Sequence, residues 1–393
     1  MIIVYANQAL PESWSSAIFL AGPTLSNDGK ISSEPSLSWR RDAIKHLEQI
    51  GYDGVVFVPE DEDGKWKNNY YGQIEWEEKC LNLADVIIFW IPRELLLMPG
   101  FTTNDEWGFW KAKDPVKLVL GTPQGAEKVR YQRYYAEKFN IPVYDSLESQ
   151  CMAAVKKIGD ITHIKRVGGE LSVPLHIWRT SSFQNWYQNL LTSGNRLDSA
   201  KVEWIFRVGS NKQIIFLWIL HVDIYIAAEN RHKTNEFVIG RPDISTILLY
   251  EKRIPVRESR IVIIKEFRSP VSNQNGYVLE LAGGSSFKNN QDPFTVAVDE
   301  CNEEAGISLT PDRFTMHQSR QLVATTLAHR AHLFSAQLTS DEMDNVARND
   351  HIVRGVEADT ERTWAKVYTY GDILNDTGVD WSMLGMITSV LTE

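Results

Sequence analysis

The stretch VIIFWIPRELLLMPGFTTNDEWGFWKAK (86–113) decides the fold of the N-terminal part of the chain. It opens with a continuous apolar run, passes through a loop and ends in a helix-like segment. Such a run is typical of a strand buried on both faces of a sheet. The same alternation continues on either side. Strands are expected at SAIFLAG (16–22), YDGVVFVPE (52–60) and VKLVLGTP (116–123), and helices at SWRRDAIKHLEQIG (38–51), IEWEEKCLNLAD (74–85) and NDEWGFWKAK (104–113).

This alternation predicts an α/β domain over residues 1–158, a doubly wound parallel sheet with helices on both faces. In the first of these helices, Ser38 is the expected N-cap and Gly51 the expected stop. Ligands of such sheets bind at the carboxyl ends of the strands. The segments to consider there are therefore FLAGPT, VPED, FWIPR and PGFTTNDE.

Composition limits the possible classes of protein. At roughly 150 residues per domain, the 393 residues correspond to two or three domains. Hydrophobic residues make up 43% and charged residues 23%, which excludes a disordered chain. The net charge of −10 provides no basic field, so no nucleic-acid partner is expected. The most apolar stretch, 214–228, is too short for a membrane span and contains His221 and Asp223.

The cysteines Cys80, Cys151 and Cys301 are far apart, with no CxxC pair. This usage fits a reducing compartment and argues against a cysteine-based zinc site, so a cytoplasmic location is expected. After the helix-like segment that precedes Gly159, residues 159–240 are expected to form a linker and a β-rich region. Residues 241–393 are expected to form a further domain.

That further domain contains YVLELAGGSSFKNNQDPFTVAVDECNEEAGI (277–307), in which a strand and a double-glycine turn lead into a helix. Asp292 is the expected N-cap of this helix and Gly306 its end. Glu300, Glu303 and Glu304 stand at i, i+3 and i+4, so they share one helix face. Their mutual repulsion favours cations between them, and oxygen ligands suit Mg²⁺ or Mn²⁺. The alternative is a solvated acidic face.

The stretch resembles the Nudix hydrolase box, with matches at Gly284, Glu300, Glu303, Glu304, Gly306 and Ile307. The resemblance implies an α/β/α fold, metal held by the three glutamates, catalysis that includes Glu303, and substrate contact at Gly284. Gln291 and Asp299 depart from the box, where the family has a structural ion pair. A hydrogen bond between Gln291 and Asp299 is the expected substitute for that pair.

The flanking segment IVIIKEFRSPV (261–271) looks like that of Nudix enzymes that hydrolyse ADP-ribose. By this resemblance Arg268 and Glu280 bind substrate or metal; a strand-end salt bridge between them is the alternative. The family also uses a late glutamate as base or metal ligand. That role falls to Glu357 or Glu361, with Glu361 taken as the catalytic candidate.

Glu106 follows the turn at 100–104. Together with FLAGP and the helix at 74–85, this turn resembles the nucleoside 2-deoxyribosyltransferase-like family over roughly residues 17–123. The resemblance implies a flavodoxin-like sheet in which Glu106 attacks the anomeric carbon at the start of a helix. Glu77 assists the base, and Glu75 is the weaker choice. The substrate-binding residues expected there are Gly22, Thr102, Thr103 and Asn104.

Two further positions depart from that family, since Phe19 replaces an orienting tyrosine and Gly100 an acidic residue. Five tryptophans in this part of the chain could stack a base, although core packing is the alternative for most of them. They are Trp39, Trp76, Trp90, Trp107 and Trp110.

Together these features predict a bifunctional nucleotide-metabolising enzyme. One site would cleave or transfer an N-glycosidic bond, and the other would hydrolyse a diphosphate linkage such as that of ADP-ribose with Mg²⁺ or Mn²⁺. Its partners would be small nucleosides or nucleotides and, by the resemblance to transferases, further copies of the chain. The alternatives are a nucleotide-pool sanitation enzyme and a nucleotide sensor with one or both sites inactive.

Overall fold

The computed structural model describes residues 1–25, 38–62, 70–159, 164–209, 212–286, 291–355 and 361–392. These residues form two compact units. Unit 1 comprises Met1–Arg179, Gly194–Val202 and His221–Glu236, and unit 2 comprises Thr180–Ser193, Glu203–Leu220 and Phe237–Glu393. Within the described ranges, no helix combines the length and apolarity needed to cross a bilayer.

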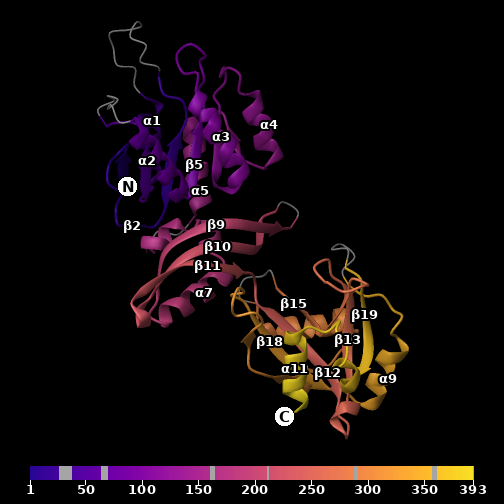
Figure 1. Ribbon diagram of the computed structural model, residues 1–393. Coiled ribbons are helices and arrows are strands. Elements are labelled where there is room, and N and C mark those ends of the chain that lie inside the picture. Colours follow the sequence, from indigo (N-terminus) through magenta and orange to yellow (C-terminus); the bar gives the residue numbers. More distant parts are fainter. Residues whose placement is uncertain are drawn as a thin grey trace. The chain divides into compact units, whose positions relative to one another are not determined.

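Unit 1 is built around a six-stranded parallel sheet (Figure 1). Its strands, in spatial order, are β1 (Ile2–Tyr5), β4 (Val55–Val58), β3 (Ala17–Ala21), β5 (Val86–Trp90), β6 (Leu118–Gly121) and β7 (Val143–Tyr144). Without β1, the order is β4-β3-β5-β6-β7. This is the flavodoxin-like order, because β4 follows β3 along the chain but precedes it in the sheet. The predicted parallel sheet is confirmed, with β1 added at its edge.

The helices of unit 1 alternate with these strands, as predicted. They are α1 (Trp39–Ile50), α2 (Tyr70–Leu83), α3 (Phe101–Lys113), α4 (Arg130–Lys138) and α5 (Leu147–Ile158), followed by the shorter α6 (Leu175–Trp178). Ser38 caps α1 by accepting from the Arg40 backbone N–H, and Gly51 ends the helix in the left-handed region. A short strand pair, β2 (Ser13–Trp14) with β8 (Arg166–Val167), completes the unit.

Helix α3 begins earlier than predicted. Gly100 adopts a left-handed conformation (φ +66°) at its N-cap, and Phe101 is already helical. The expectation that Glu106 starts the helix is therefore wrong, because the FTTN residues form the first turn instead of a loop.

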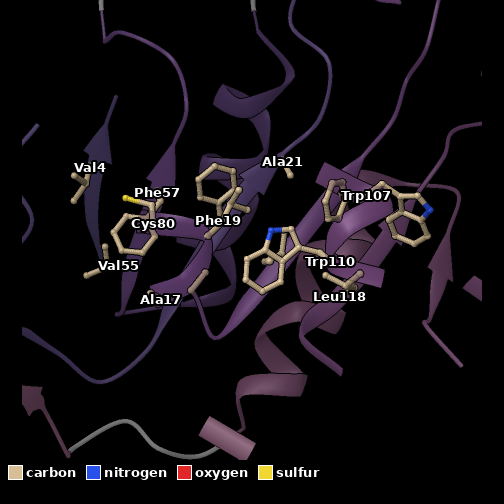
Figure 2. Packing of buried hydrophobic residues seen from close by; sticks show 14 of the residues in the cluster. Val4, Ala17, Phe19, Ala21, Val55, Phe57, Cys80, Trp107, Trp110 and Leu118 are labelled. Carbon is tan, nitrogen blue, oxygen red and sulfur yellow. The ribbon is translucent and has the colours of Figure 1, made fainter. Parts of the chain in front are cut away.

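The helices pack on both faces of the sheet. Figure 2 shows the core on one face, where Phe19, Phe57, Trp107 and Trp110 lie among side chains of α2, α3 and α4. On the other face α1 packs against α5. Alternate residues of β3 serve both cores, which explains why its sequence is apolar at every position.

Three long antiparallel strands contain residues of both units, and the helix before them belongs to unit 2. They are α7 (Ser181–Thr192), β9 (Arg196–Val208), β10 (Ile214–Ile226) and β11 (Arg231–Gly240), with β10 in the middle of the sheet. These strands occupy the region for which the sequence predicted β structure.

The second large sheet lies in unit 2 and is mixed. Its central strands are β12 (Ile244–Glu251), which pairs in parallel with β18 (Arg330–Gln337), and β13 (Arg260–Phe267), which pairs antiparallel with β12 and β19 (Thr363–Thr369). The remaining strands are β14 (Tyr277–Glu280), β15 (Ala282–Gly284), β16 (Thr315–Met316) and β17 (Arg320–Gln321).

Apolar clusters cover both faces of this mixed sheet. Helices α8 (Pro293–Glu300) and α9 (Ser340–Arg348) contribute to one cluster, and α10 (Tyr370–Ile373) and α11 (Trp381–Leu391) to the other. The unit is thus layered helix, sheet, helix. Its assignment to the Nudix fold stays a prediction.

Helix α8 continues into a π-helical turn, Cys301–Ala305, and Gly306 ends it in the left-handed region (φ +68°). Asp292 occupies the predicted N-cap position, but its side chain accepts no capping hydrogen bond from the backbone. The widened turn carries Glu303 and Glu304, the last two carboxylates of the acidic face.

Candidate active sites

A cavity of about 440 Å³ lies at the carboxyl ends of β3 and β5, where the strand order of the unit 1 sheet reverses. Residues 22–25 after β3 and residues 99–103 around the start of α3 form its walls. Glu77 of α2 and Glu106 of α3 also line it. Ligands of open α/β sheets bind at this kind of position, and the volume suits a small molecule.

Arg40 lies in the lining of this cavity and was not predicted from the sequence. Its guanidinium is buried and donates to Gly22 O (2.6 Å), Leu20 O (3.0 Å) and Thr24 Oγ1 (3.0 Å). It also forms an ion pair with Glu60 at 2.5 Å. Arg40 therefore holds the turn after β3 in place and brings a positive charge to the cavity.

Glu106 and Glu77, the two catalytic candidates from the sequence, both line the cavity and form an acidic pair. Burial, and then the charge of Glu77, raise the pKa of Glu106 to about 8, while Arg40 opposes the shift. Burial also raises the pKa of Glu77, against a hydrogen bond from Gln73 Nε2 (2.8 Å) and the charge of Arg40. Glu75, the weaker candidate, is exposed and does not line the cavity. Two carboxyl groups with raised pKa values are typical of acid–base and nucleophilic sites.

The other predicted residues of this site divide into two groups. Gly22, Thr102 and Thr103 line the cavity. A Cβ on Gly22 would lie 2.2 Å from Trp90 O, so only glycine fits there. Asn104 is not in the lining, because its Oδ1 accepts from Arg93 Nη2 (2.6 Å) and Gln132 Nε2 (2.8 Å).

Phe19 is fully buried in the unit 1 core, so this ring does not face the cavity. Gly100 does line the cavity. Of the five tryptophans considered for base stacking, all except Trp39 are buried. Trp39 is partly exposed, and its Nε1 donates to Pro23 O (3.0 Å) beside the cavity. For most of the tryptophans, core packing is therefore the role that the structure supports.

In unit 2, three carboxylates from different elements converge. Oxygen atoms of Glu266, Glu304 and Glu361 lie within 4.8 Å of one another. Glu304 follows α8, Glu361 precedes β19, and Glu266 belongs to β13 and was not predicted. Glu304 is 5% exposed and accepts from the Gly283 backbone N–H at 2.8 Å. We call Glu266, Glu304 and Glu361 the carboxylate cluster.

Electrostatic repulsion and burial act together on these groups. Burial, with smaller contributions from Glu361 and Glu280, raises the pKa of Glu266 to about 7, although the charge of Arg268 opposes the shift. Burial, and then the charges of Glu300, Glu361 and Glu266, raise the pKa of Glu304 well above its usual range, against the hydrogen bond from the Gly283 N–H. A divalent cation would offset this repulsion, and an all-oxygen donor set fits Mg²⁺ or Mn²⁺.

Glu300 lies close to the cluster and Glu303 does not belong to it. Burial, and then Glu303 and Glu361, raise the pKa of Glu300 to about 7. The Glu300 carboxylate lies directly over Gly284, where a Cβ would be 2.0 Å from its Oε1. Glu303 is exposed. The predicted set of Glu300, Glu303 and Glu304 is thus only partly brought together.

Arg268 and Glu280, the predicted substrate- or metal-binding residues, form an ion pair with each other. Arg268 Nη2 forms ion pairs with Glu266 (2.8 Å) and Glu280 (3.2 Å), so the strand-end salt bridge is present. Glu357, the other late glutamate, lies outside the described residues.

The two departures from the Nudix box do not pair in the way expected from the sequence. Gln291 accepts a hydrogen bond from Ser286, and no Gln291–Asp299 hydrogen bond is found among the described residues. Asp299 is exposed on α8. The expected substitute for the family ion pair is therefore absent from this part of the structure.

Comparison with known families supports the assignment of unit 1. Residues 15–124 match the model of the family described as "Nucleoside 2-deoxyribosyltransferase like". The N-terminal part of the chain is therefore a nucleoside 2-deoxyribosyltransferase-like domain, and its parallel sheet agrees with that assignment. The match does not extend to the C-terminal residues. No curated protein matches the chain.

Proposed function

We propose that the cavity of unit 1 cleaves or transfers the N-glycosidic bond of a nucleoside or nucleotide. The observation that carries this proposal is the Glu106–Glu77 pair at the carboxyl ends of the strands, within a domain of the transferase-like family. A Glu106 oxygen attacks the anomeric carbon as the bond to the base breaks, and protonated Glu77 gives its proton to the leaving base. Arg40 favours the ionised form of the nucleophile.

The raised pKa of Glu106 makes the proposed reaction pH-dependent. Because Glu106 must be ionised and Glu77 protonated, we expect a bell-shaped pH profile of kcat/KM for base release by the native chain. In Glu77→Gln, where only Glu106 of the pair titrates, the residual rate should rise with pH to a plateau. Stability should fall as the pH rises. A carboxyl group with a raised pKa in the folded state favours folding at low pH, and this contribution is lost as pH rises through about 8.

The measurements are a pH–rate profile of base release and thermal unfolding at pH 6 and pH 9. From pH 6 to pH 9 the Tm of Glu106→Gln should fall less than that of the native chain, because Glu106 no longer titrates while other carboxyl groups with raised pKa values, such as Glu266 and Glu300, still do. A residual rate that falls between pH 6 and pH 8 in Glu77→Gln would contradict the nucleophilic role and would favour Glu106 as a proton donor.

We propose that unit 2 hydrolyses a diphosphate linkage in a nucleotide such as ADP-ribose. The carboxylate cluster, with Glu300 beside it, carries this proposal. These residues would hold Mg²⁺ or Mn²⁺, which when bound neutralises phosphoryl charge and lowers the pKa of an attacking water. Glu361 is the candidate for orienting that water, since it is the least buried member of the cluster.

One panel tests both activities. Nucleosides, nucleotides, NAD and ADP-ribose are incubated with the full-length chain with and without Mg²⁺, and the products are separated by chromatography. Free base should form without added metal, and nucleoside monophosphate should form only with it. If neither product forms from any compound, both enzymatic proposals fail, and the affinity of the chain for the same compounds is measured instead. The core position of Phe19, which leaves no orienting hydroxyl there, then favours a nucleotide sensor.

We also propose that copies of the chain assemble beside the unit 1 cavity. Phe101 lines the cavity but is 78% exposed, and the preceding loop carries Leu96, which is 94% exposed. A second copy covering these side chains would enclose the site. We expect light scattering to give a dimer or larger assembly that Leu96→Glu dissociates, with loss of base release. A monomeric, fully active native chain would contradict this proposal.

A further inference from the structure

Arg241, between β11 and β12, carries a positive charge that no carboxylate balances among the residues that the structure describes. Its guanidinium stacks on the Phe216 ring at 4.6 Å, and its Nη2 donates to Ser285 Oγ at 3.0 Å. The Nε atom is buried and has no hydrogen-bond partner in the described ranges. Burial, and then the charge of Arg268, lower the pKa of Arg241. A charge taken out of water normally has a partner of opposite sign.

His329 lies beside Arg241 and has an unused nitrogen as well. It is only 5% exposed, and its Nδ1 has no hydrogen-bond partner among the described residues. Burial and the charge of Arg241 lower the pKa of His329 to about 4, against the charge of Asp243, which is paired with His332, so the ring is neutral at neutral pH. The strand register agrees with this placement, because Ile244 of β12 lies opposite Ala331 of β18. Arg241 and His329 therefore stand at the same end of two paired strands.

A three-residue segment connects this pair to the carboxylate cluster. The Gly283 N–H donates to Glu304, Gly284 lies under the Glu300 carboxylate, and the Ser285 hydroxyl accepts from Arg241. Consecutive residues thus contact the acidic groups at one end and the guanidinium at the other. Arg268 forms ion pairs with Glu266 and Glu280, whereas no ion pair of Arg241 is found among the described residues.

We propose that Arg241 and His329 bind a phosphoryl oxygen of a diphosphate-containing ligand whose other phosphoryl group lies at the carboxylate cluster; this rests on the function proposed for unit 2. The Arg241 Nε–H and an N–H of the imidazole donate to the oxygen, and the ligand supplies the missing negative charge. Guanidinium groups suit phosphoryl oxygens because their donors are planar and always charged. Arg241 and His329 are binding residues in this proposal and take no part in bond breaking.

A test on the unaltered chain uses NMR of histidines labelled at Cε1, with the His329 signal assigned from His329→Gln. The probe is methylenediphosphonate, a non-hydrolysable diphosphate analogue, with Mg²⁺. We expect a saturable shift of the His329 signal, and a titration midpoint that rises from about 4 when the probe is bound. A probe that binds the chain without moving the His329 signal would overturn the proposal.

Variants then test the role of the cation. Arg241→Gln should weaken methylenediphosphonate binding about 10- to 100-fold, the range for a lost hydrogen bond to a charged group. Arg241→Lys should recover part of this loss. Arg348→Gln removes the same charge from an exposed position of α9 and should change nothing. Equal affinity of Arg241→Gln and the native chain would refute the assignment.

The two proposals for unit 2 fail in different ways. If ADP-ribose is not hydrolysed but the His329 signal responds to the probe, the oxyanion site stands and the hydrolase proposal falls. If ADP-ribose is hydrolysed and Arg241→Gln leaves KM unchanged, the hydrolase stands and the Arg241–His329 site falls. Where Arg241→Gln does not fold, as judged by circular dichroism, the native-chain titration decides.

Discussion

Glu106→Gln is expected to abolish base release, with a loss of roughly four orders of magnitude or more, as for removal of a catalytic nucleophile. The amide has nearly the same shape as the carboxyl group, so the α3 helix and the cavity should remain intact. Diphosphate hydrolysis should be unchanged, because the carboxylate cluster belongs to unit 2. The measurement is chromatography of base and nucleotide products from the same preparation.

Two glutamates of α2 provide matched comparisons for this variant. Glu77→Gln should cost about 10²- to 10⁴-fold, the range for general acid–base assistance. Glu75→Gln, from an exposed position two residues earlier, should be silent. A 2-fluoro sugar analogue should label Glu106 and be found there by mass spectrometry. Native-like base release by Glu106→Gln would reduce unit 1 to a binding domain.

Glu304→Gln is expected to lower diphosphate hydrolysis about 10²- to 10³-fold, as for loss of a group that stabilises transition-state charge. Glu304 is the most buried carboxylate of α8 and its π-helical turn. It belongs to the carboxylate cluster and accepts a hydrogen bond from the Gly283 N–H. EDTA should have an effect at least as large. Base release should continue in both experiments.

Glu303→Gln is the natural control, because Glu303 is the adjacent residue and is exposed. We expect a smaller loss than for Glu304→Gln, even though the resemblance to the Nudix box assigns catalysis to Glu303 and only metal binding to Glu304. Similar losses for both variants would mean that the bound metal draws Glu303 into its coordination. Full activity of Glu304→Gln, or full activity in EDTA, would contradict the metal-dependent proposal.

The apolar runs in the N-terminal half were sufficient to predict its sheet. In β3 and β5 every residue is buried, which is the property of a strand covered on both faces. The position of Glu106 in the second turn of α3 was not predictable in the same way. It depends on the left-handed conformation of Gly100, and a Gly-Phe-Thr-Thr sequence is equally compatible with a loop.

Arg40 and Glu266, which were not predicted as site residues, each stand at a position where the periodicity of their helix or strand calls for an apolar residue. Arg40 stands three and four residues before Ala43 and Ile44, on the buried face of α1. Glu266 alternates with Val262 and Ile264, which face the cluster of α8 and α9. A charge on such a face must have a partner or a ligand. The identity of that partner depends on distant strands, so sequence analysis could not supply it.

The division of the chain into units has a consequence for its biosynthesis. Unit 1 includes His221–Glu236, whereas Thr180–Ser193, which comes earlier in the sequence, belongs to unit 2. The two units are therefore interleaved along the chain. On the ribosome, the N-terminal unit therefore cannot complete its contacts when its own sheet and helices have emerged. Unit 1 is complete only after residues 221–236, which reach into β11, have been synthesised. By that point residues 180–193 and 203–220 of unit 2 have been synthesised as well. Folding of the two halves is expected to be coupled in time during translation, and a nascent chain stopped near residue 180 should remain sensitive to protease.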